Sequence, residues 1–146
     1  MSKQVKTMKV DHRKIYKADG IVRINDDLEL ILVETAGPFR KEDACKTAFD
    51  NSKGMFALLA MLKTIADKYY FASCQSFKKL KVLYLQPSDC YLRLWQTNYS
   101  KNGHYEYIRV AKAVVSEEEK AEEACLCSLN QFTMKMKVRI ELLVIQ

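Results

Sequence analysis

The sequence predicts an α+β domain with a central mixed β-sheet of about five strands, flanked by a long helix, a short helix and a C-terminal helix. The predicted order of elements is ββα-α-βββα. Several short segments alternate apolar and polar residues, and two longer ones repeat apolar residues every three or four positions. The chain of 146 residues is 49% hydrophobic, with 4 Gly and 2 Pro, which is typical of one globular domain.

A β-hairpin is predicted over residues 18–34, with its turn at Asn25-Asp26-Asp27. If the loop consists of the last two of these turn residues, counting outward from it places Asp19 directly opposite Glu34. Its second strand, residues 28–34, is apolar on most of both faces. We therefore expect this strand to be central in the sheet and covered on both sides.

Two helical segments are predicted after the hairpin. The first runs from Lys41 to Tyr70 and follows the strand-breaking Gly37-Pro38 pair. Asn51-Ser52-Lys53-Gly54 weakens its middle, which leaves open two helices or one bent helix. A shorter helical segment is expected from Gln75 to Leu80.

Three further strands are predicted at residues 81–86, 90–97 and 104–115. The turn before the last of them contains Asn102-Gly103, a pair that favours tight hairpins. Strict alternation predicts that one face of the last strand carries Tyr105, Tyr107, Arg109 and Ala111.

Ser116 and Glu119 match a capping box, so a C-terminal amphipathic helix is predicted over 117–145. We expect its apolar stripe to pack on the core or to bind a partner protein or a second copy of the chain. The apolar residues 142–145 also leave open that the sequence is part of a longer protein.

Residues 1–17 form a basic arm in which six cations accompany one acid, out of a net charge of +6. Such an arm attracts polyanions such as nucleic acid, and the alternative is a solvated terminal segment. The sequence has no stretch of about 20 apolar residues and no signal-peptide core. We therefore expect an intracellular protein, cytoplasmic or nuclear, that does not enter a membrane. Its five cysteines lack zinc-ligand spacing and are expected to be free thiols.

The most informative feature is the expected pairing of Asp19 with Glu34. Residues opposite each other on one face of a sheet have Cβ atoms roughly 5 Å apart. Two carboxylates that close repel each other unless a cation or a proton lies between them. The pair therefore predicts a divalent-metal site.

A carboxylate at the start of one strand and another at the end of its antiparallel neighbour, with a helix following, resembles the PD-(D/E)XK, or restriction-endonuclease-like, nuclease fold. A group of uncharacterised fungal proteins with a nuclease-like core is similar over about residues 17–115, through the segments 17–20, 34–39 and 49–54. The resemblance implies that residues 18–146 are a nuclease-like domain. It also implies that Asp19 and Glu34 hold a divalent cation, usually Mg²⁺, for phosphodiester hydrolysis in nucleic acid.

The resemblance has one departure, because the family motif requires a lysine where this chain has Ala36. A lysine of the following helix would have to replace it, and the candidates are Lys46 and Lys53. Asp50 and Lys53 are equally explained as a surface ion pair. The sequence thus leaves open an active nuclease, an inactive relative of one, and a non-catalytic interaction or structural module that uses the C-terminal helix.

Overall fold

The computed structural model describes residues 18–24, 28–41, 43–115 and 122–144. It has the predicted α+β fold, a five-stranded mixed sheet with its elements in the order ββα-α-βββα. The basic arm at 1–17, the hairpin turn at 25–27 and the capping box at 116–119 lie outside the described residues.

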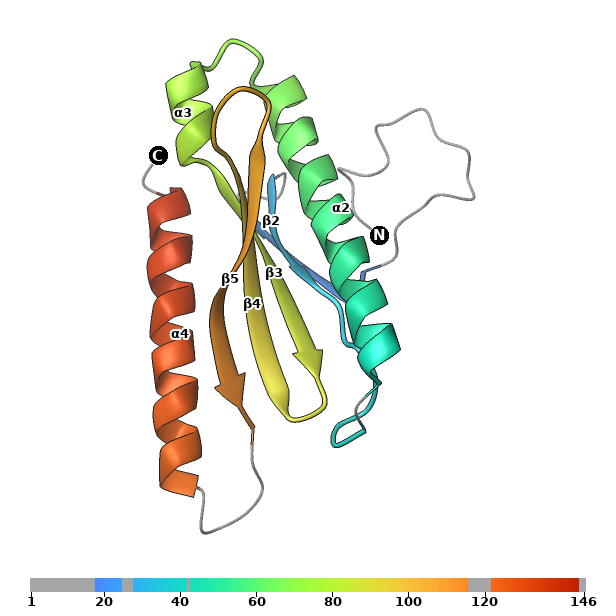
Figure 1. The fold of residues 1–146 in the computed structure, drawn as a ribbon. Coiled ribbons are helices and arrows are strands. Elements are labelled where there is room, and N and C mark those ends of the chain that lie inside the picture. Colours follow the sequence, from blue (N-terminus) through green and yellow to red (C-terminus); the bar gives the residue numbers. More distant parts are fainter. Residues whose placement is uncertain (1–17, 25–27, 42, 116–121, 145–146) are drawn as a thin grey trace.

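The sheet is built from neighbours in sequence (Figure 1). Its strands are β1 (Gly20–Ile24), β2 (Leu28–Val33), β3 (Lys81–Ser88), β4 (Tyr91–Tyr99) and β5 (Tyr105–Val114), in spatial order β1-β2-β3-β4-β5. β2 and β3 are parallel, and the other neighbours are antiparallel. A parallel pair needs a long crossover connection, and the chain between β2 and β3 provides it as helix.

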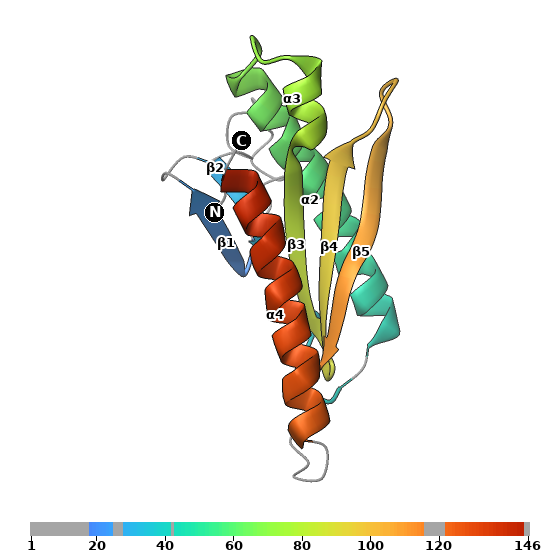
Figure 2. The same ribbon diagram turned by 90° about the vertical axis from the view of Figure 1, so that its left-hand side faces the viewer.

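Helices lie on both faces of the sheet (Figure 2). α2 (Ala44–Lys68) covers one face, where it contacts β2, β3 and β4. α4 (Glu122–Val144) lies on the opposite face and contacts β5. The short α3 (Cys74–Lys79) leads into β3. Among the described residues, no helix is long and apolar enough to cross a membrane.

α2 is one continuous helix, which decides between the two alternatives left by residues 51–54. The Asp43 side chain caps its N-terminus by accepting a hydrogen bond from the Lys46 backbone N–H at 2.8 Å. Gly54 lies against the buried ring of Tyr84, and a Cβ at position 54 would be 2.4 Å from the Tyr84 Cε1 atom. The glycine therefore allows α2 to pack closely on β3.

β2 occupies the central position that its apolar faces predicted. It lies between β1 and β3, and Glu29, Leu30, Ile31 and Leu32 are all buried. The core around it joins the inner face of α2 to β3, β4 and Phe132 of α4.

The predicted alternation in β5 is wrong at one point. The pairing of β4 with β5 shifts by one residue, so that Leu94 pairs with Ala111 and Trp95 pairs with Arg109. Val110 is the extra residue, and an extra residue in one strand reverses its alternation. Ala111 is consequently buried on the opposite face from Arg109, and Lys112 takes the face where Ala111 was expected.

Candidate functional site

The hairpin brings Asp19 and Glu34 together at one end of the sheet. Gly20 pairs with Val33 in the predicted register, although a bulge nearer the turn shifts the pairing there by one residue. Asp19 immediately precedes β1 and Glu34 immediately follows β2. The Oδ2 atom of Asp19 accepts a hydrogen bond from the Thr35 backbone N–H at 2.7 Å, which fastens the start of β1 to the end of β2.

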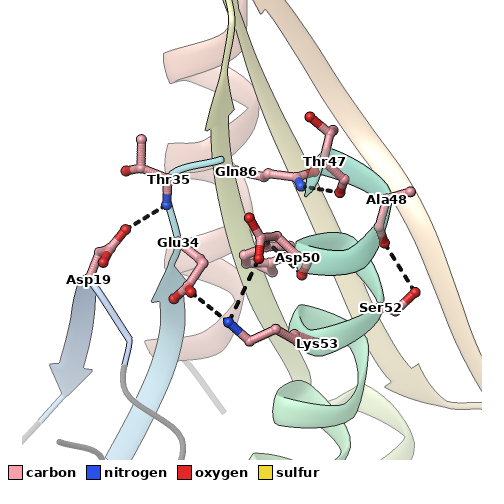
Figure 3. A network of polar contacts seen from close by, with 10 residues as sticks. Asp19, Glu34, Thr35, Thr47, Ala48, Asp50, Ser52, Lys53 and Gln86 are labelled. Atoms are coloured by element: carbon pink, nitrogen blue, oxygen red, sulfur yellow. Dashed lines mark hydrogen bonds and ion pairs between the residues drawn. The ribbon is translucent and has the colours of Figure 1, made fainter. Parts of the chain in front are cut away.

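Lys53 of α2 points toward Glu34 and Asp50, whereas the Asp19 carboxylate points toward the Thr35 backbone (Figure 3). Its Nζ atom lies 3.0 Å from Oε1 of Glu34 and 3.7 Å from Oδ1 of Asp50. Asp50 is only 4% exposed and Glu34 8% exposed. The interpretation of Asp50 and Lys53 as a surface pair is therefore wrong, because Asp50 belongs to a buried cluster with Glu34.

Lys46, the other candidate lysine, lies in the first turn of α2. A helix rises about 1.5 Å per residue, so this position lies about 10 Å along the axis from Lys53. Lys46 is exposed, and its backbone N–H donates to the Asp43 cap. Of these two lysines, the structure brings Lys53 to the acids.

The cluster of Glu34, Asp50 and Lys53 contains two carboxylates and one ammonium group. Within the described part of the chain, the buried Oε2 of Glu34 and Oδ2 of Asp50 have no hydrogen-bond partner. A buried acceptor without a partner costs about 1–3 kcal/mol. The cluster can therefore accept a further donor or a cation.

The hydrogen bond to Glu34 raises the pKa of Lys53 above its ordinary value of 10.5, partial burial lowers it, and the charges of Glu34 and Asp50 raise it. The raising contributions prevail, so the ammonium group stays protonated at neutral pH. Lys53 thus acts at this site as a hydrogen-bond donor and a positive charge.

Gln86 joins the site to the rest of the sheet, and sequence reasoning missed it. Its buried side chain donates to the Thr47 carbonyl oxygen at 3.0 Å and accepts from the Trp95 Nε1–H at 3.2 Å. The Glu34 backbone N–H donates to the Leu85 carbonyl, which continues the parallel ladder and places Glu34 beside Gln86. The predicted strand ends at Gln86, whereas β3 continues to Ser88, so the sequence pattern gave no sign that Gln86 lies inside a strand.

The predicted metal ligands fit Mg²⁺ better than zinc or calcium. Among the described residues, no group of three or more His, Cys, Asp and Glu side chains could hold a metal ion. Structural zinc needs four protein ligands and calcium six to eight oxygens. Mg²⁺ keeps several waters and is held by one or two carboxylates together with substrate phosphates. The predicted pair, Asp19 and Glu34, supplies two carboxylates, the number that such sparse coordination uses.

Comparison of the chain with models of protein families, with curated proteins and with solved structures finds no match. One fold supports many functions, so the architecture alone does not assign an activity. The interpretation of the site depends on Asp19, Glu34, Asp50 and Lys53 and on what surrounds them.

Proposed function

We propose that this protein is a Mg²⁺-dependent nuclease of the PD-(D/E)XK type, in which Lys53 of α2 replaces the lysine missing at Ala36. The observation that carries the proposal is the 3.0 Å contact between Lys53 Nζ and Glu34 Oε1. It puts an ammonium group beside the second acid of the pair, where the family motif needs one.

The surroundings of Ala36 explain why a lysine would come from the helix. Ala36 is 1% exposed, and its backbone N–H donates to the Pro87 carbonyl at 2.9 Å. A lysine at this position would have to bury its long side chain. Lys53 instead approaches Glu34 from α2, through partly open space.

Each residue of the site has a role in this proposal. Asp19 and Glu34 would hold the ion, which stabilises the negative charge that develops on the phosphate. Lys53, protonated at neutral pH, donates to the attacking water or to a phosphate oxygen. Asp50 holds the Lys53 side chain in place over Glu34.

The test is cleavage of labelled DNA and RNA with and without Mg²⁺. Glu34→Gln, Asp19→Asn and Lys53→Met should each reduce the cleavage rate at least 100-fold. Lys63→Met is the matched control, because Lys63 lies on the same helix in an exposed pair with Asp67. Cleavage that survives both Asp19→Ala and Glu34→Ala contradicts the proposal.

A second candidate function, a non-catalytic interaction module, is favoured by the outer surface of α4. Leu126, Met134 and Val138 are 54%, 59% and 48% exposed there. Such exposed apolar side chains are typical of a surface that binds a partner helix or a second copy of the chain. Light scattering tests binding to a second copy of the chain. Association that the triple variant Leu126→Ser, Met134→Ser, Val138→Ser abolishes supports it, and a monomer at all concentrations rejects self-association.

A further inference from the structure

We propose that the uncovered face of β4 and β5 beside α2 binds the phosphate backbone of a nucleic-acid strand through Arg93, Arg109 and Lys112. These three residues are called the cationic face below. The inference rests on the proposed nuclease function and adds to it a binding surface that recognises backbone rather than bases.

The sheet register places all three cations on the side of α2. Arg93 pairs with Gln86, and Gln86 contacts Thr47 of α2. Lys112 pairs with Arg93. Directly paired residues of antiparallel strands lie on one face of a sheet. The bulge at Val110 places Arg109 on this face as well, because Arg109 pairs with Trp95.

The cationic face lies in line with the acids. A row runs across the sheet from Asp19 through Glu34, Gln86 and Arg93 to Lys112, one residue for each strand. Neighbouring strands are about 4.8 Å apart, so the backbone at Arg93 lies about 10 Å from the backbone at Glu34, and the backbone at Lys112 lies about 14 Å from it. The row thus changes from carboxylates to cations within a short length of a nucleic-acid strand.

The three cations lie close to aromatic rings on the same face of the sheet. The Nζ atom of Lys112 lies 3.6 Å from the centre of the Tyr91 ring, and the guanidinium carbon of Arg93 lies 5.1 Å from the same ring. The guanidinium of Arg109 lies 5.7 Å from the centre of the Trp95 ring. These cation–π contacts orient the charges and also cover the ring faces on which bases would stack. The face therefore suits phosphates.

Trp95 is tied into α2 as well. Its ring stacks on Tyr107 with centres 5.0 Å apart, and the Tyr107 hydroxyl bonds to Asn51 of α2. A hollow of about 200 Å³ lies here, lined by Ala44, Thr47, Ala48, Asn51, Gln86, Arg93 and Trp95. The small side chains of Ala44 and Ala48 leave room for a nucleic-acid strand to cross the first turns of α2. Asp50 and Lys53 meet Glu34 from the same half of α2, so a nucleic-acid strand that crosses the first turns of the helix runs toward the acids.

The test measures binding in EDTA, so that cleavage plays no part. Labelled single-stranded and duplex DNA and single-stranded RNA of mixed sequence are titrated at several salt concentrations. The triple variant Arg93→Gln, Arg109→Gln, Lys112→Gln is compared with Lys78→Gln, Lys79→Gln, Lys135→Gln, which removes the same charge from exposed lysines on α3 and α4. The cationic-face variant should bind at least 10-fold more weakly than the control. Its salt dependence should fall by about two to three units, from 0.7–0.9 per phosphate contact.

Trp95, the single tryptophan of the chain, reports directly on this face. Nucleic acid should change its emission, and inorganic polyphosphate should compete, because polyphosphate offers phosphates without bases. Equal affinity of the two triple variants overturns the inference, as does failure of polyphosphate to compete. Lys112→Glu, a single exposed change, replaces the triple variant if that variant does not fold.

The result is distinguishable from the outcome of the nuclease test. If the wild-type protein never cleaves but the cationic-face variant loses binding, the binding surface is supported and the nuclease function is rejected. If the wild-type protein cleaves and the cationic-face variant binds and cleaves as well as the wild type, the binding surface is rejected.

Discussion

Lys53 and Glu34 are 19 residues apart in the chain, and their side chains form a 3.0 Å ion pair between α2 and the end of β2. The pair joins the crossover helix to the strand that precedes it. It also places one cation between two buried carboxylates, since Asp50 lies on the other side of the same ammonium group.

Removing this cation should destabilise the protein. Breaking a fully buried pair costs about 3–5 kcal/mol. Because the Lys53 side chain is 34% exposed, we expect Lys53→Met to lower the free energy of unfolding by a smaller amount, about 1–2 kcal/mol. Urea unfolding measures the change, and Lys46→Met, an exposed change on the same helix, should stay within about 0.5 kcal/mol of wild type. Equal losses in both variants would contradict the pairing.

The contribution of Lys53 should disappear at alkaline pH. The pKa of Lys53 is raised in the folded protein above 10.5. A raised pKa means that the stabilisation is fully present below the unfolded-state value and is lost as the pH rises through the folded-state value. The stability difference between wild type and Lys53→Met should therefore be constant from pH 7 to about pH 9.5 and shrink above about pH 10.5. A difference that grows with pH would contradict this assignment.

Mg²⁺ should stabilise the folded protein even without a substrate, because it relieves the unpartnered oxygens of Glu34 and Asp50. At ten times its dissociation constant, a ligand adds about 1.4 kcal/mol, which corresponds to a rise in Tm of about 4 °C for a chain of this size. Differential scanning fluorimetry measures the shift. Glu34→Gln should abolish it and the exposed Asp67→Asn should keep it; a shift that Glu34→Gln leaves intact would place the ion elsewhere.

Gly54→Ala should destabilise the protein although alanine favours helix. The substitution gains about 1 kcal/mol in helix propensity. Its Cβ, however, would lie 2.4 Å from the ring of Tyr84, which is buried and whose hydroxyl donates to the Asp50 carbonyl at 3.2 Å. Because that bond holds the ring in place, we expect a net loss of about 1–3 kcal/mol in urea unfolding. Ser52→Ala, exposed on the same helix, is the control, and a stabilised Gly54→Ala would show that the ring can move.

The position of the acid pair was predicted by counting outward from an assumed two-residue loop. The pairing of Ile24 with Leu28 instead leaves three residues between the strands, and a bulge at Leu30 of β2 compensates for the extra one, so that the far end of the hairpin keeps the predicted register. The order of helices and strands was predictable because the period of the apolar residues in a long segment distinguishes a helix from a strand.

The choice of lysine was not predictable from the sequence. Lys46 and Lys53 are seven residues apart and so lie on the same side of a helix. Which of them meets Glu34 depends on where α2 packs along the sheet, and the contact of Gly54 with Tyr84 fixes that position. The bulge at Val110 was not predictable either. The residues around it put a similar mixture of polar and apolar side chains on each face of the strand, whether or not an extra residue is inserted.

Gln86 offers a test of how the acids and the cationic face are connected. Gln86→Leu removes the partners of the Trp95 Nε1–H and the Thr47 carbonyl, so we expect a loss of about 2 kcal/mol that does not vary with pH.

Gln86→Glu instead buries a third carboxylate beside Glu34 and Asp50. Burial and like charge raise the pKa of such a group, so the folded protein binds a proton that the unfolded chain releases. The stability of Gln86→Glu should therefore fall, relative to Gln86→Leu, as the pH rises from 4 to 7. At pH 7, Mg²⁺ should stabilise Gln86→Glu more than Gln86→Leu, because the added carboxylate lies beside Glu34 and Asp50. Parallel pH profiles for the two variants, measured by urea unfolding, would show that position 86 is electrostatically separate from the acids.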